Sequence, residues 1–189
     1  MSTLGVFAFG KLPSHGDFIA RGLSAPERQA WDDWVSAGLV LAREALGDGF
    51  EAAHDQAPPW RFAFGDGAFG PGRRAGAFAA SVDRAGRRFL IVLGATAPTG
   101  LDPDGAGAAA AQILEAELYS AFRTGADVDA LVQSAAAALA GFEPGAAAAA
   151  TGRFWTLDPE EAVAAEIRAD APPSDLLVRA LRTSEPHHG

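Results

Sequence analysis

The chain has 189 residues, of which 49% are hydrophobic, and this size and composition suffice for one domain with a well-buried core. It contains no cysteine, which excludes disulfides, thiolate metal sites and cysteine nucleophiles and is typical of a reducing compartment. The formal net charge of −9 repels phosphate backbones, so general binding to nucleic acids or anionic membranes is not expected.

The first predicted element is a short strand over residues 4–9, where aromatic and β-branched residues cluster before Gly10. No basic segment precedes this apolar run, and the run is too short for an export signal. The longer apolar stretches are rich in alanine and are interrupted, so none approaches the roughly 20 residues that cross a bilayer. We therefore expect a soluble protein.

A helix is predicted from Ser24 to about residue 46. Ser24 and Glu27 form the pattern of a capping box, and Pro26 stands in the first turn, where a missing amide costs little. Gly47 is expected to end this helix. Apolar residues recur at spacings of three and four, which predicts that one helix face packs against a sheet: Trp31, Trp34, Val35, Leu39, Ala42, Ala45 and Leu46.

The middle of the chain is predicted to be rich in hairpins. Strands are expected over residues 60–64, 75–82 and 88–93, and the last two are joined by a turn over residues 83–87. We expect the three strands to be antiparallel.

After residue 104 the pattern becomes helical, with helices predicted over residues 108–122 and 128–139. The alanines of residues 146–150 are bracketed by glycines, which disfavours a helix there, and residues 154–157 favour a closing strand. A short helix is predicted over 174–181. Together these elements predict an α+β sandwich with helices on both faces of the sheet, in a single domain spanning residues 1–189 whose tail, residues 184–189, frays.

Residues 5–11 satisfy the first seven positions of a phosphate-binding P-loop. The next residue is Leu12 where the motif needs Ser or Thr to hold magnesium, and Pro13 follows where a helix would supply amides. We therefore interpret this segment as a strand and predict no nucleotide cofactor.

Ser14, His15 and Asp17 lie close together in sequence, which suggests a catalytic triad. Neighbours on an extended loop point apart, however, and no nucleophile elbow is present. Asp17 is better explained as a capping or turn-bonding carboxylate. The enzymatic alternative is a small hydrolase that uses Ser14 or Ser81 with His15 and Asp83.

Metal ligands are too sparse to predict a metal site. His15 and Asp17 make only two ligands, His54 is expected in an unrelated loop, and His187 and His188 belong to the tail. The four tryptophans are expected to be core anchors. One cluster of cations is open to two interpretations, a basic patch or a solvated hairpin turn: Arg73, Arg74, Arg84, Arg87 and Arg88.

Several stretches resemble the TagF-like (ImpM) family of type VI secretion accessory proteins. They are GKLPSHGDF at residues 10–18 and SVDRAGRRF at 81–89, with further matches at residues 21–23, 31–34, 57–62 and 154–155. The chain departs from the family pattern at Ala80 and Leu90, where the family usually has proline.

The resemblance implies an α/β sandwich with a central, mainly antiparallel sheet, longin-like in topology. It also implies a cytoplasmic, post-translational repressor of the secretion machine that acts through a forkhead-associated scaffold protein. It does not imply catalysis.

We hypothesise that residues 11–18 and the hairpin of residues 81–89 lie together and dock this partner, because loops on a rigid sheet commonly carry binding residues. Charge reversal at Arg84 and Arg87 is expected to weaken capture of the partner while unfolding temperature stays nearly unchanged. The predicted partner-binding residues are Lys11, Ser14, His15, Asp17, Ser81, Asp83, Arg84 and Arg87.

Overall fold

The computed structural model describes residues 4–65, 67–146 and 151–183. Its strands are β1 (Gly5–Gly10), β2 (Ile19–Arg21), β3 (Trp60–Gly65), β4 (Arg73–Val82), β5 (Arg88–Ala97), β6 (Arg153–Leu157) and β7 (Val163–Arg168). Its α-helices are α1 (Ala25–Leu46), α2 (Phe50–Gln56), α3 (Ala106–Thr124), α4 (Val128–Ala138) and α5 (Leu176–Arg182), with short 3-10 turns η1 (Gly47–Gly49) and η2 (Gly67–Phe69).

The strands of the described ranges form one open, seven-stranded sheet in the order β2-β1-β5-β4-β3-β6-β7, and every neighbouring pair is antiparallel. The β4–β5 hairpin lies near the centre and pairs along its full length, from Arg73 opposite Ala97 to Val82 opposite Arg88. The α+β class and the antiparallel sheet predicted from sequence are therefore confirmed.

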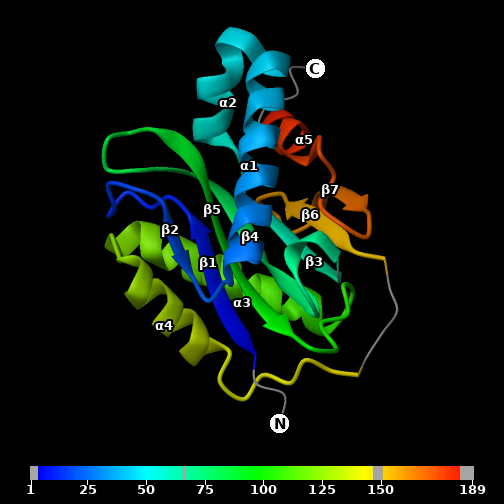
Figure 1. The fold of residues 1–189 in the computed structure, drawn as a ribbon. Coiled ribbons are helices and arrows are strands. Elements are labelled where there is room, and N and C mark those ends of the chain that lie inside the picture. Colours follow the sequence, from blue (N-terminus) through cyan, green and yellow to red (C-terminus); the bar gives the residue numbers. More distant parts are fainter. Residues whose placement is uncertain (1–3, 66, 147–150, 184–189) are drawn as a thin grey trace.

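Helices cover both faces of the sheet (Figure 1). Helices α1, α2 and α5 lie on one face, and α3 and α4 lie on the other. The core of the α1 face is aromatic and centres on Trp31, whereas the core of the α3 face is built from small and aliphatic side chains such as Leu114 and Leu131. No helix in the described ranges is both long and apolar enough to cross a membrane.

Helix α1 begins as the sequence predicts. Both arms of the capping box are present, since Ser24 accepts from the amide of Glu27 and the Glu27 carboxylate accepts from the amide of Ser24. The other Glu27 oxygen accepts from Arg74, which is buried at the start of β4, at 2.8 Å. The helix start is thus tied to the central hairpin.

Two strands and one α-helix were not predicted: β2, β7 and α2. Strand β2 has only three residues, α2 only seven, and β7 contains two alanines of low strand propensity. Short segments are fixed by their neighbours in space more than by their own pattern. The expectations for most of the alanine run, residues 147–150, and for the tail, residues 184–189, lie outside the described residues.

Candidate functional site

The end of β1 and the β4–β5 hairpin meet at one rim of the sheet. Strand β1 pairs with β5 as far as Gly10 opposite Ile91, and the amide of Lys11 donates to the carbonyl of Leu90 at 2.9 Å. The chain leaving β1 therefore emerges beside the turn that joins β4 to β5. We call this surface, residues 11–18 and 81–89, the loop face.

Four hydrogen bonds to backbone carbonyls join the two segments of the loop face. The Arg84 amide donates to the carbonyl of His15 at 2.8 Å, and the Arg84 guanidinium donates to the carbonyl of Ser14. Arg87 donates to the carbonyl of Gly16 at 2.9 Å. The buried Ser81 hydroxyl donates to the carbonyl of Lys11 at 2.7 Å, across 70 positions of sequence. The expected meeting of these segments is confirmed.

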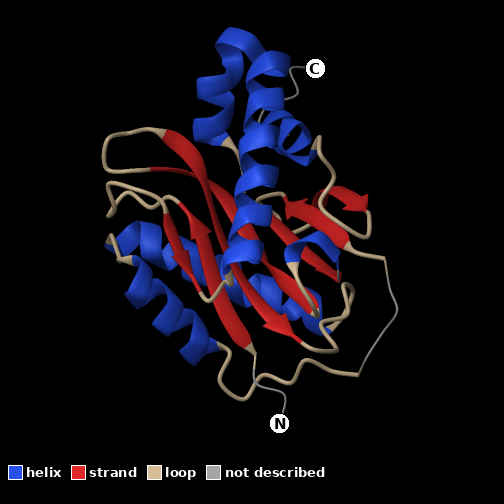
Figure 2. Ribbon diagram, in the orientation of Figure 1, coloured by secondary structure: helices blue, strands red, loops and turns tan. Residues whose placement is uncertain are grey.

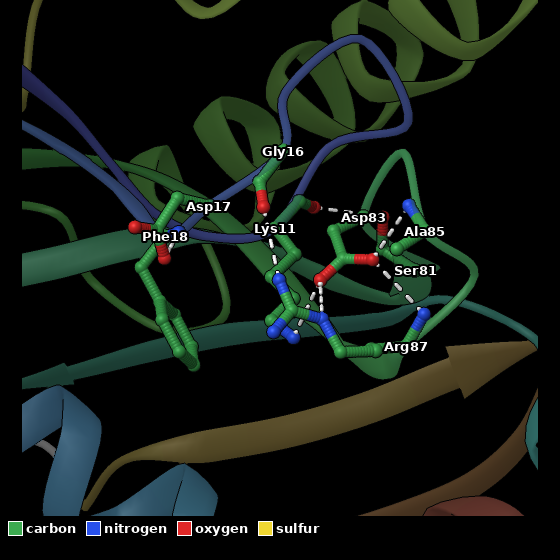
Figure 3. A network of polar contacts seen from close by, with 8 residues as sticks. All are labelled: Lys11, Gly16, Asp17, Phe18, Ser81, Asp83, Ala85 and Arg87. Atoms are coloured by element: carbon green, nitrogen blue, oxygen red, sulfur yellow. Dashed lines mark hydrogen bonds and ion pairs between the residues drawn. The ribbon is translucent and has the colours of Figure 1, made fainter.

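A buried carboxylate lies at the centre of the loop face (Figure 3). Oδ2 of Asp83 is 2.9 Å from Nζ of Lys11 and 2.6 Å from Nε of Arg87. Its Oδ1 accepts from the amides of Ala85 and Arg87 at 2.9 and 3.0 Å. The Asp83 side chain is 0% exposed and that of Lys11 is 7% exposed, whereas that of Arg87 is 62% exposed.

These contacts decide the protonation state of Asp83. Burial by itself raises the pKa of the carboxyl. Hydrogen bonds from the Arg87 amide and from the side chains of Lys11 and Arg87 outweigh burial and hold the pKa of Asp83 well below its ordinary value. The group is thus a carboxylate that locks both the turn and the β1 loop in place.

The turn itself forms as its sequence predicts. Gly86 has a φ of 78°, in the left-handed region that glycine tolerates, and its amide donates to the carbonyl of Asp83 at 2.9 Å. Asp17 accepts from the amide of Phe18 at 2.8 Å, which agrees with a turn-bonding role. Within the turn, Arg87 pairs with Asp83.

Phe18 is the exposed aromatic residue of the loop face, and its role was not singled out from sequence. Its side chain is 50% exposed, and its ring lies edge-on to Phe89 with centroids 4.8 Å apart. Nζ of Lys11 sits 4.8 Å from the centre of the Phe18 ring. A single phenylalanine in a polar loop gives no periodic signal, so only the packing shows that the ring is held at the surface.

Ser14 and His15 come close enough for a nucleophile and a base, since Oγ of Ser14 is 2.9 Å from Nδ1 of His15. The same hydroxyl is 2.9 Å from the carbonyl of Ala126, which can only accept. The one hydroxyl proton therefore goes to Ala126, and His15 acts as a donor to Ser14. Asp83, the third member of the hydrolase alternative, is bound to Lys11 instead.

The basic patch considered from sequence is not formed. Arg73 and Arg74 lie at the start of β4, whereas Arg84 and Arg87 follow its end, so a ten-residue strand of about 33 Å separates the pairs. Arg74 is buried and pairs with a carboxylate of α1 at 2.8 Å. Arg88 pairs with two carboxylates of α2. Arg84 and Arg87 are exposed residues of the hairpin turn, which is the other interpretation given from sequence.

Contrary to the expectation from sequence, His54 lies in α2 and not in a loop. It is 1% exposed, and its Nε2 is 2.7 Å from the carbonyl of Phe89, which fixes a proton on that nitrogen. The histidine therefore anchors α2 to the start of β5. Among the residues that the structure describes, no three potential metal ligands gather at one place. Trp31, Trp60 and Trp155 are buried core residues, as predicted.

The fold and the loop face together define an α+β sandwich that presents one ordered pair of loops at the sheet rim. The model of the TagF N-terminal domain, a family described as type VI secretion system-associated, matches residues 7–140. Since this match spans more than half of the chain, the protein belongs to that family. The crystal structure of PA0076 from Pseudomonas aeruginosa PAO1 is similar, with a TM-score of 0.70, 22% identity and coverage of 93% of each chain.

At that identity the likeness to PA0076 supports the fold alone. A search of curated proteins found no match.

Proposed function

We propose that this protein is a cytoplasmic accessory factor that represses the type VI secretion machine post-translationally by binding a protein partner through the loop face. The partner is a forkhead-associated scaffold protein of the same system. Membership of a type VI secretion system-associated family supports the cellular system. The geometry of the loop face supports binding.

One observation carries the proposal: the loop face is organised in advance. The Asp83 carboxylate, four hydrogen bonds between the segments and the sheet beneath fix its backbone before any partner arrives. Because little conformational entropy remains to be lost, such a surface binds more tightly per contact than a mobile one.

The predicted partner-binding residues divide into two groups by burial. Lys11, Ser81 and Asp83 are buried, and in this proposal they position the surface. Arg84 and Arg87 are exposed, as is Asp17, while Ser14 and His15 are half-buried. With the exposed ring of residue 18 they form the contact surface: an aromatic anchor ringed by charges, a pattern frequent in binding hot spots.

Single substitutions of Phe18 and of Arg84 test the proposal. We expect Phe18→Ser and Arg84→Glu each to raise the Kd for the scaffold protein at least about tenfold, since both groups meet the partner. Val40→Ser is the matched control, because Val40 on α1 is as exposed as Phe18, at 52%. Titration calorimetry gives the Kd, and calorimetric unfolding gives the Tm.

Unchanged affinity in both loop-face variants would refute the loop face as the docking surface. An equal loss in Val40→Ser would refute its specificity. Arg87 is unsuited to this test, because Arg87→Glu would bring a second carboxylate to the buried Asp83, which Arg87 contacts at 2.6 Å. From sequence, charge reversal at Arg87 was expected to leave the unfolding temperature nearly unchanged. Because of its contact with Asp83, we now expect Arg87→Glu to lower it.

In this proposal the protein acts by binding and not by catalysis. The Ser14–His15 contact provides a test of that point. Fluorophosphonate probes label a serine that a neighbouring base activates. We expect no labelling of Ser14, because its proton is directed to the carbonyl of Ala126. Labelling that disappears in Ser14→Ala would instead support the hydrolase alternative.

A further inference from the structure

Strand β7 forms one edge of the sheet, at the far side from β2 (Figure 2). It is last in the strand order, and within the described ranges it pairs only with β6. It is six residues long, and its exposed and half-buried residues alternate toward its C-terminal end. A free edge of this length is a template for a further strand.

The backbone groups on the free side of β7 follow from its pairing with β6. The amide of Ala169 donates to the carbonyl of Gly152 at 3.0 Å, so residue 169 points its backbone toward β6. Along an antiparallel strand this direction alternates with every residue. Glu166 and Arg168 therefore direct their N–H and C=O groups away from β6, toward the open edge.

The side chains of β7 also alternate between the two faces of the sheet. Ala165 and Ile167 pack against the aromatic core of the α1 face. Glu166 and Arg168 lie on the opposite face and contact one another at 2.6 Å. The strand thus has an apolar side and a charged side whose two charges are of opposite sign.

We propose that a second copy of this chain pairs with β7 in antiparallel register, with Ile167 opposite Ile167 at the two-fold axis. In this register the outward backbone N–H and C=O groups of Glu166 meet those of Arg168 in the second copy. By symmetry, those of Arg168 meet Glu166 of the second copy. Each pair exchanges two backbone hydrogen bonds and places opposite charges side by side. The two sheets then join into one.

Competing registers are less favourable. A shift that places Glu166 opposite Glu166 sets like charges against each other. A shift by a single residue places the side chains of Ile167 and Glu166 on one face, so the apolar face of one copy would continue into the charged face of the other. Only the register with Ile167 opposite Ile167 places Glu166 opposite Arg168 of the second copy.

The charged side of β7 is already ordered for this pairing. Arg168 contacts Asp104 at 2.7 Å, and Glu166 contacts Arg153 at 2.8 Å. These pairs already restrict both side chains, so less side-chain entropy is lost when the second strand arrives. Charged residues often protect an edge from pairing, but here their signs complement those of a second copy.

Symmetric cross-linking tests the register, because the native chain has no cysteine. Non-hydrogen-bonded residues that face each other have Cα atoms about 4.5 Å apart, within the range that a disulfide spans. Ile167→Cys should therefore form a covalent dimer under mild oxidation. Ala165→Cys is the matched control, since its two copies would lie about 14 Å apart, four residues along the strands.

We expect Ile167→Cys to cross-link at least about ten times faster than Ala165→Cys. Adding Glu166→Pro should abolish this difference, because proline removes an amide that faces the free edge and takes no part in the monomer's ladder. The Tm of each variant checks that it is folded. Light scattering of the native chain should show a mass above 19.4 kDa that rises with concentration.

Equal cross-linking rates at residues 165 and 167 would overturn the register. A native mass that stays at 19.4 kDa up to millimolar concentration would overturn the dimer. Neither result would bear on the loop face, which lies on the β1, β4 and β5 side of the sheet.

Discussion

A single carboxylate organises the loop face. Asp83 is the point where the β1 loop, through Lys11, and the hairpin turn, through Arg87, are joined. Removing one member of a buried ion pair leaves the other charge without compensation, which is more costly than losing an exposed pair. At the scale of residues, the arrangement of the loop face thus depends on two buried groups, Asp83 and Lys11, together with the exposed Arg87.

The lowered pKa of Asp83 makes its contribution to stability dependent on pH. A carboxyl whose pKa is lower in the folded state stabilises the fold above its ordinary pKa of 3.8, and this stability is lost as the pH falls toward the folded pKa. We expect Asp83→Asn to be less stable than the native chain at pH 7, with the difference narrowing between pH 4 and pH 2. Urea midpoints at several pH values measure this.

Asp55 provides the comparison for this prediction. A hydrogen bond from Arg88 lowers the pKa of Asp55 to about 2, but its side chain is 50% exposed. Solvent screens such a pair, so Asp55→Asn should cost less at pH 7 than Asp83→Asn. A difference between the native chain and Asp83→Asn that does not vary with pH would contradict the ion-pair explanation.

At the scale of elements, two glycines in the central hairpin make room for the aromatic core. Gly76 and Gly94 face each other across β4 and β5. A Cβ on Gly94 would lie 2.2 Å from the ring of Phe7, and one on Gly76 would lie 2.2 Å from the carbonyl oxygen of Leu93 and 2.8 Å from the ring of Phe62. Both rings therefore rest directly on the sheet, beneath Trp31 of α1.

Gly94→Ala should destabilise the protein by about 2 kcal/mol, because the added methyl group overpacks the space that Phe7 fills. Phe7→Leu should relieve part of this cost. We expect the double variant to be less destabilised than the sum of the two single variants, as measured by urea unfolding. If the changes in free energy of unfolding simply add, the new methyl group does not press against Phe7.

The elements also show how far local pattern predicts this fold. Helix α1 and the β4–β5 hairpin are predicted because a capping box and a turn with Gly86 mark their ends. Strands β2 and β7 carry no such signals, and they form because β1 and β6 present free edges to them. Their existence depends on neighbours in space.

At the scale of the whole molecule, one sheet separates two cores of different chemistry. The α1 face contains Trp31 and Trp60, whereas Trp155 belongs to the α3 face. Because the same strands supply both cores, loss of packing on either face weakens the sheet on which the other core rests. We therefore expect a single cooperative unfolding transition.

The variant Trp155→Phe tests this cooperativity. Its tryptophan fluorescence reports on the α1 face alone, while far-UV circular dichroism also reports on α3 and α4. We expect both signals to share one urea midpoint. Loss of the dichroism signal at a lower urea concentration than the fluorescence signal would show that α3 and α4 unfold separately.

The sequence by itself determined the α+β class, the antiparallel hairpins, the start of α1 and the two segments that form the loop face. Each depends on local chemistry: apolar periodicity, a helix cap, or a turn that needs a carboxylate and a glycine. Only the tertiary structure decided that Lys11, Ser81 and Asp83 are buried, that Phe18 is exposed, and that β7 is an edge strand of the sheet that the described residues form. Burial and strand pairing are set by segments distant in sequence, so no local pattern records them.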